Sequence, residues 1–151
     1  MLRTLRRLIE FSAAEWLLLL QLFILSLVME TGLRLLPFPR LVRFLSMGAN
    51  TTLLHRLPLL HKTSDWTRLA VLADLAARVT RGQGRCLVRS LLRLWLLRIR
   101  GESAELLIGV SREASVLHAH AWIEAPERMI VGQSADTAGR FTPLLRFSVK
   151  A

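Results

Sequence analysis

Two histidines and one cysteine are the residues whose types and spacing could support chemistry in this sequence. His118 and His120 lie inside the apolar stretch VLHAHAWIE, residues 116–124, and Cys86 is the only cysteine among the 151 residues. An imidazole can serve as a metal ligand, a general base or a hydrogen-bonded core residue. A lone cysteine with histidines elsewhere in the chain is a candidate nucleophile. The neighbouring residues must therefore distinguish a metal site from a thiol–imidazole pair.

The alternating pattern of residues 117–124 predicts a β-strand. Because alternate residues of a strand share a face, His118, His120 and Trp122 are expected to point the same way. Two histidines at this spacing could share a metal ion, but the sequence offers no second cysteine and no clear set of carboxylates to complete the ligands. We therefore expect no metal at this site.

Cys86 follows the glycine-containing segment RGQGR, residues 81–85, and opens a predicted helix over residues 86–100. The free backbone N–H groups and the dipole at a helix N-terminus favour negative charge, so a thiol there has a lowered pKa. A histidine held against such a thiol can accept its proton and later return it to a leaving amine. The alternative is that Cys86 is a small buried side chain without a chemical role.

The elements that must position these groups are predicted as helices before and just after the cysteine, followed by strands. Residues 2–36 are expected to form one helix, or two helices broken near Thr31–Gly32, and the prolines of PFPR, residues 37–40, end it. Further helices are expected at residues 41–47, 66–80 and 86–100, and strands at residues 104–110, 117–124, 128–133 and 140–149. This order predicts an α+β fold with an antiparallel sheet.

Two details of these elements can be anticipated. In the helix over residues 86–100, Arg89, Arg93 and Arg100 are expected on one side, with leucines on another. Pro143 favours an edge position for the last strand, or a later start to it, because proline cannot donate to a neighbouring strand.

The segment AAEWLLLLQLFILSLVM, residues 13–29, is nearly all apolar. It is shorter than the run of about 20 apolar residues that a spanning helix needs, and it contains Glu15 and Gln21. We expect this helix to be buried or packed against a partner. A helix lying on a membrane surface and a true membrane span are the alternatives.

The net charge is +10, and nearly all of the positive charge is arginine. Such a charge permits an acidic peptide, an anionic membrane or a nucleic acid as a partner. The arginines are scattered along the chain, and no aromatic ladder or recognised nucleic-acid motif accompanies them. Nucleic-acid binding is therefore not expected.

Several segments together resemble the standalone, transglutaminase-like leader peptidases of lasso-peptide biosynthesis. They are CLVRSLLRLWLLRIRGESAELLIGV, which begins at Cys86, then HAHAWIE, MIVGQ and RFTPLLRF. The resemblance covers about residues 66–151. It implies a papain-like fold and a cysteine peptidase that removes the leader from a ribosomally made precursor, so that a partner cyclase similar to asparagine synthetase can close the macrolactam. It places the nucleophile at Cys86 and the base at His120 of the HAW motif.

The resemblance leaves the third catalytic residue open. Family members often carry an aspartate on the next strand, at the place where this chain has Gly132. We expect Gln133 to orient the ring of His120, with Asp136 as the alternative, because an amide can take this role in cysteine peptidases. A weak Cys–His dyad without a third residue, or a catalytically poor scaffold, is the other alternative.

The remaining candidates belong to the walls of the site. Gln83 is a candidate donor to an oxyanion hole, together with the backbone N–H of Cys86. His118 does not match a catalytic position of the family, and we expect it to line the site or to be a packed, hydrogen-bonded imidazole. Trp122 is expected to form a wall of the site.

The chain is expected to divide into an apolar helical extension at residues 1–60, which docks a partner or a membrane, and a peptidase core at residues 61–151. Some relatives carry a winged-helix-like domain that grips the leader, whereas the first 60 residues here have the pattern of hydrophobic helices. A separate leader-binding protein is therefore expected. We expect no bound cofactor and a cytoplasmic location, with membrane association as the alternative; a nucleotide requirement is left open. The alternative function is a non-catalytic helical adaptor or membrane-associated scaffold.

Overall fold

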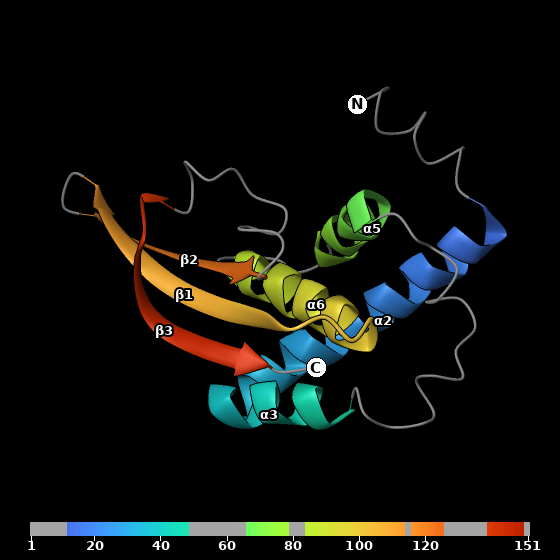
Figure 1. Cartoon of the computed structure of the whole chain (residues 1–151), viewed down its shortest axis with the longest axis horizontal. Helices are drawn as coiled ribbons and strands as arrows, with labels where there is room; N and C mark the ends of the chain where they lie inside the picture. The colour runs from blue at the N-terminus through green and yellow to red at the C-terminus, as the bar shows by residue number, and fades with distance from the viewer. Residues whose placement is uncertain (1–11, 49–65, 79–83, 114–115, 126–138, 150–151) are drawn as a thin grey trace.

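The computed structural model describes residues 12–48, 66–78, 84–113, 116–125 and 139–149. Within them, helices precede strands along the chain (Figure 1). The helices are α2 (Ala13–Leu35), α3 (Phe38–Gly48), α5 (Trp66–Ala77) and α6 (Arg85–Ile99), and the strands are β1 (Ala104–Glu113), β2 (Val116–Glu124) and β3 (Thr142–Val149). The predicted α+β fold is confirmed.

The strands form an antiparallel sheet in the order β2-β1-β3. β1 is the central strand, and its residue Gly109 pairs with His120 of β2 and with Pro143 of β3. The prediction that Pro143 lies in an edge strand is confirmed within the described sheet. The strand predicted at residues 128–133 lies outside the described residues.

Helix α6 lies between the sheet and the other helices (Figure 1). It contacts β1 and β2 on one side and α2 and α5 on the other. The main core is therefore built from leucine-rich faces of all these elements, including Leu18, Leu22, Leu69, Leu72, Leu91, Leu92, Leu106 and Ile123. A second, smaller cluster of Leu107, Trp122 and Phe141 is separate from it. Burial of α6 on both sides fixes the position of its N-terminal end.

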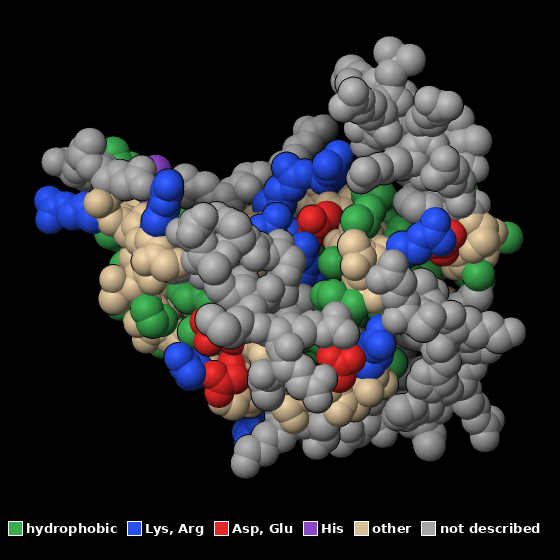
Figure 2. Space-filling view, turned by 45° about the horizontal axis from the view of Figure 1, so that its top comes forward, with side chains coloured by type: hydrophobic (Ala, Val, Ile, Leu, Met, Phe, Trp, Pro, Cys, Tyr) green, Lys and Arg blue, Asp and Glu red, His purple; other side chains and the backbone are tan. Residues whose placement is uncertain are grey.

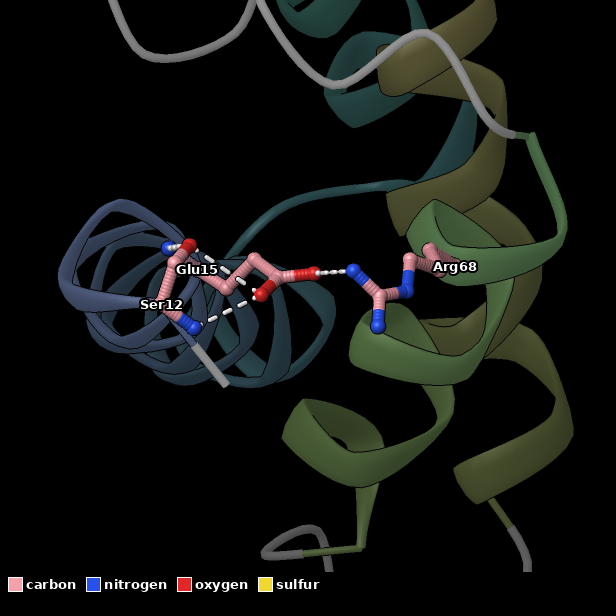
Figure 3. A network of polar contacts seen from close by, with 3 residues as sticks. All are labelled: Ser12, Glu15 and Arg68. Carbon is pink, nitrogen blue, oxygen red and sulfur yellow. Dashed lines mark hydrogen bonds and ion pairs between the residues drawn. The ribbon is translucent and has the colours of Figure 1, made fainter. Parts of the chain in front are cut away.

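Helix α2 begins with a capping box that also joins it to α5 (Figure 3). The backbone N–H of Glu15 donates to the hydroxyl of Ser12, while the Glu15 carboxylate accepts from the backbone N–H of Ser12 at 2.8 Å. The other carboxylate oxygen of Glu15 accepts from Nη1 of Arg68 at 2.8 Å. This arrangement explains how a carboxylate can be buried at the start of an apolar helix: it is fully hydrogen-bonded.

Helix α2 runs without interruption through Thr31–Gly32, where the sequence allowed a break. Gly32 is instead the point at which α3 packs closely on α2, since a Cβ there would lie 2.7 Å from Cδ1 of Leu41. Pro37 ends α2, as predicted, but Pro39 lies in the first turn of α3, where its missing N–H has no cost. The prediction of a short helix at residues 41–47 was therefore too short.

Helix α6 ends at Ile99, and Gly101 terminates it as predicted. The backbone N–H of Glu102 donates to the carbonyl of Leu97, that of Gly101 donates to Arg98, and Gly101 has a φ of 73°. This is the Schellman pattern, for which glycine is favoured. Arg89 and Arg93 lie close together, as expected for one side of this helix, but Arg93 is buried and forms an ion pair with Asp74.

The boundary expected near residue 60 lies outside the described residues, so the division into an extension and a core stays a prediction. One fact bears on the relation between the parts. Helix α2, from the first part, and helices α5 and α6, from the second, contribute to one hydrophobic core.

Helix α2 is long and apolar enough to cross a membrane, with a mean hydropathy of 1.9 over its most apolar window. Length and composition alone are weak evidence, because core helices and signal sequences share them. Its inner side, including Leu18 and Leu22, is buried in the core, whereas a row of large apolar side chains is exposed. We call the exposed row the outer face of α2; it comprises Trp16, Leu17, Leu20, Ile24, Leu27, Val28 and Leu35.

The Glu15–Arg68 ion pair is expected to contribute to the attachment of α2. Arg68→Met leaves the carboxylate of Glu15, only 6% exposed, without its cation. We expect the free energy of unfolding to fall by about 1–3 kcal/mol, measured by chemical denaturation. The matched control is Arg34→Met, which breaks an exposed pair with Glu30 and should cost no more than about 0.5 kcal/mol. Equal losses in the two variants would contradict this account.

Candidate active site

Cys86 is the second residue of α6, which begins at Arg85, and lies in the first turn of this helix. Gly84 precedes the helix and provides no side-chain cap. The first backbone bond of the helix runs from the N–H of Val88 to the carbonyl of Gly84, so the amides of Cys86 and Leu87 lack acceptors within the helix. The thiol, half-buried, therefore lies where backbone N–H groups favour a negative charge, as the sequence predicted.

Strand β2 brings His120 to Cys86. The thiol is hydrogen-bonded to the imidazole of His120 and also interacts with the backbone N–H of the next residue, Ala121. The carbonyl of Ala121 accepts a hydrogen bond of 2.9 Å from the hydroxyl of Ser90, which lies one helical turn after Cys86. Both backbone polar groups of Ala121 are thus bound by side chains of α6, and this fixes the helix against the strand beside the histidine.

The environment of Cys86 favours the thiolate. Burial raises the pKa of the Cys86 thiol, but the hydrogen bond from His120, the N–H of Ala121, the charge of His120 and the N–H of Leu87 lower it. The lowering effects together are larger, so the pKa lies below its ordinary value. A larger fraction of Cys86 is therefore the nucleophilic thiolate at neutral pH than for a free cysteine.

Aromatic side chains hold the ring of His120. The ring lies 5.0 Å from that of Phe141 and stacks near Trp122, with centroids 6.4 Å apart and planes inclined by 13°. The indole N–H of Trp122 donates to Glu124 at 3.0 Å. Trp122 thus packs beside the ring of His120, while its role as a wall of the site stays a prediction.

Gly109 makes room for this aromatic arrangement. A Cβ at Gly109 would lie 2.8 Å from Cη2 of Trp122 and 2.7 Å from the carbonyl oxygen of Thr142. Any side chain at this position would therefore displace the indole or strand β3. Since Gly109 pairs with His120 in the sheet, the absence of a side chain there helps to set the place of the imidazole.

A cavity of about 350 Å³ opens beside the thiol and the imidazole. Its walls come from the start of α6 and from the sheet, and they include Leu87, Ile108, Leu117, Ala119 and His118. His118 is exposed and lines this cavity, but it is not among the groups that act on the Cys86 thiol. The space is mainly apolar and reaches the sulfur, as a binding pocket for a substrate side chain requires.

The structure brings Cys86, His120, His118 and Trp122 together, while their chemical roles stay predictions. Gln83, Gln133 and Asp136 lie outside the described residues, so the oxyanion donor and the ring-orienting residue also stay predictions. Among the described residues, no group of three or more histidine, cysteine, aspartate or glutamate side chains could hold a metal ion.

Sequence reasoning missed Ser90, Gly109 and Phe141. Ser90 follows Cys86 by four residues and therefore shares its side of the helix, which was a usable signal. The places of Gly109 and Phe141 depend on strand register and on a bulge between β1 and β3 near Ile108 and Gly109. No local pattern in the sequence indicates these features.

The thiolate can be tested directly, because Cys86 is the only cysteine and its ultraviolet absorbance titrates alone. In His120→Ala the burial that raises the pKa remains while the largest lowering contact is lost, so the pKa of Cys86 should rise. Alkylation by iodoacetamide at neutral pH should slow by about an order of magnitude, the scale of a hydrogen bond to a charged group. His118→Ala should leave the titration unchanged. An unaltered thiol pKa in His120→Ala would refute the assigned contact.

Comparison with families of known proteins gives a match that covers most of the chain. The model of the transglutaminase-like superfamily matches residues 32–146, which include the end of α2, the cysteine helix, strands β1 and β2 and the first part of β3. Neither the curated proteins nor the solved structures gave a significant match. Members of this superfamily are generally thiol enzymes, in keeping with the Cys86–His120 contact. The chain belongs to the transglutaminase-like superfamily.

Proposed function

We propose that this chain is a cysteine peptidase that removes the leader from a ribosomally synthesised lasso-peptide precursor. The hydrogen-bonded contact between the thiol of Cys86 and the imidazole of His120 carries the proposal. Membership of a superfamily of thiol enzymes supports the chemistry. The resemblance of the segments around these two residues to leader peptidases supports the substrate class.

The first half of the proposed reaction forms a thioester. The Cys86 thiolate attacks the carbonyl carbon of the scissile amide, and the carbonyl π electrons move to oxygen. When the tetrahedral intermediate collapses, the C–N bond breaks and His120 gives its proton to the leaving amine. The product amine is the new N-terminus of the core peptide, and the leader remains attached to sulfur.

The second half releases the leader. His120, now neutral, takes a proton from water as the water oxygen attacks the thioester carbonyl carbon. The C–S bond then breaks and releases the leader with a C-terminal carboxylate, while the proton stays on His120 or passes to the sulfur of Cys86. The backbone N–H of Cys86 has no acceptor within the helix and is a donor for the developing oxyanion. Gln83 is proposed as the second donor, and Gln133, or alternatively Asp136, as the residue that orients His120.

The outer face of α2 is the proposed docking surface for a separate leader-binding protein. Leu20, Ile24 and Val28 are each more than half exposed on this face, although the opposite side of the helix is buried. An exposed apolar row of this kind usually marks an interaction surface. The proposed complex acts in the cytoplasm together with a macrolactam cyclase similar to asparagine synthetase. Seating of the same face on a membrane is the competing arrangement.

The catalytic proposal predicts that Cys86→Ala and His120→Ala abolish leader removal while the fold is kept, as judged by circular dichroism. The expected loss is at least about 10³-fold, the scale for a nucleophile or its base. His118→Ala should retain measurable activity, because His118 lines the cavity without acting on the thiol. The assay is mass spectrometry of the precursor with its leader-binding protein present. Undiminished cleavage by Cys86→Ala would leave the adaptor function as the remaining candidate.

The docking proposal predicts that Leu20→Gln/Ile24→Gln weakens binding to the leader-binding protein at least about tenfold, because two apolar contacts of the outer face are lost. The thiol pKa of Cys86 should not change, since neither residue lies near it. Val71→Gln, at an exposed apolar position of α5, is the matched control. Isothermal titration gives the affinity, and flotation with anionic lipid vesicles tests the membrane arrangement. Vesicle binding that the same double substitution removes, with partner affinity unchanged, would overturn the docking proposal.

A further inference from the structure

A second hollow, of about 280 Å³, adjoins Cys86 on the side of α5. Its described lining consists of Asp74 on α5, Arg78 just after it, and Arg85 and Arg89 on α6, together with Cys86 itself. In Figure 2, basic side chains gather beside an acidic one in the upper middle of the view. We call this hollow the basic cleft. It does not include His118 or His120, which line the other cavity.

The basic cleft carries an excess of positive charge. Its one described carboxylate, Asp74, pairs at 2.7 Å with Nη2 of Arg93, whose side chain is only 4% exposed. Within the described part of the chain, Arg78, Arg85 and Arg89 form no ion pair. The charge of Asp74 is therefore balanced by the arginine behind it, and no carboxylate of the described residues compensates the three lining arginines.

The surroundings of Arg89 show that this excess of positive charge is energetically unfavourable. The Nε of Arg89 is buried and has no hydrogen-bond partner among the described residues. Burial lowers the pKa of Arg93, Asp74 raises it, and the nearby positive charge of Arg89 lowers it. Two guanidinium groups are thus kept close together with a single carboxylate. An anion entering the cleft would relieve this repulsion and supply the missing acceptor.

We propose that the basic cleft is a substrate subsite that binds a carboxylate of the peptide next to the bond attacked by Cys86. This inference rests on the proposed peptidase function. Guanidinium groups bind carboxylates through paired N–H donors, which gives both affinity and orientation. Cys86 lines both hollows, so a peptide lying across it places one flank in the mainly apolar cavity and the other in the basic cleft. The selected sequence has an apolar residue on one side of the scissile bond and a carboxylate on the other.

Two alkylating reagents of nearly equal size test the cleft without any peptide. Iodoacetate carries a carboxylate and iodoacetamide does not. The rate constant of iodoacetate at Cys86 divided by that of iodoacetamide therefore reports local positive charge. In Arg78→Gln/Arg89→Gln this ratio should fall by about threefold to tenfold, the effect expected from removing two charges near a partly solvated site. High salt should reduce the ratio in the unaltered protein. Arg40→Gln, on α3 and outside both hollows, should leave it unchanged. An unchanged ratio in the double variant would overturn the proposal.

Peptides then identify the source of the carboxylate. The acidic residues near the cleavage site of the precursor are replaced by their amides, one at a time. The unaltered protein should cut the variant that lacks the bound carboxylate more slowly than the original precursor. The variant Arg78→Gln/Arg89→Gln should cut this amide-substituted precursor and the original precursor at nearly the same rate. Truncated peptides with free and amidated C-termini test a chain-end carboxylate in the same way. The subsite would be overturned if the unaltered protein cut acidic peptides and their amide variants equally well and showed no preference for a free chain end.

The two experiments separate failure of the subsite from failure of the peptidase proposal. A lowered reagent ratio in the double variant with no cleavage of any precursor would support an anion-binding cleft beside the thiol and reject peptide cleavage. Cleavage that depends on Cys86 but not on substrate charge would support the peptidase and reject the subsite.

Discussion

The backbone of Ala121 makes the contacts on which the candidate site depends. Its N–H interacts with the sulfur of Cys86, and its carbonyl accepts a hydrogen bond from the hydroxyl of Ser90. Cys86 and Ser90 are one turn apart on α6, so the backbone of this single residue fixes both the distance and the rotation of the helix relative to β2. His120 precedes Ala121 in the strand, and the imidazole is therefore brought to the thiol by backbone geometry.

The rest of the fold holds this contact in place from two sides. Helices α2 and α5 cover α6 and bury its leucines, so the helix cannot rotate without exposing the core. On the other side, Trp122 and Phe141 pack against the His120 ring above the bare backbone of Gly109. The thiol–imidazole pair is thus positioned by a helix and a strand, as an arrangement that must hold its geometry requires.

The local elements of this arrangement could be predicted from the sequence. The glycine-containing segment before Cys86 and the apolar period after it predicted a helix start. The alternation around His120 predicted a strand, and the α+β order followed from both. Contacts between distant elements were not predictable in this way. Burial of Arg93 depends on Asp74 of a neighbouring helix. The basic cleft exists only because the end of α5 packs beside the start of α6. Gly132 replaced the expected aspartate, so no pattern identified the third residue.

The central claim is that Cys86 is a nucleophile held against His120, and the covalent intermediate tests it most directly. Reactions of the protein with a precursor peptide and the leader-binding protein would be quenched in acid within the first turnover and measured by intact-protein mass spectrometry. The account predicts an adduct with the mass of the leader fragment, mapped to Cys86 and removed by hydroxylamine as a thioester would be. Cleavage of the precursor without any adduct on Cys86, and at an undiminished rate in Cys86→Ala, would contradict it.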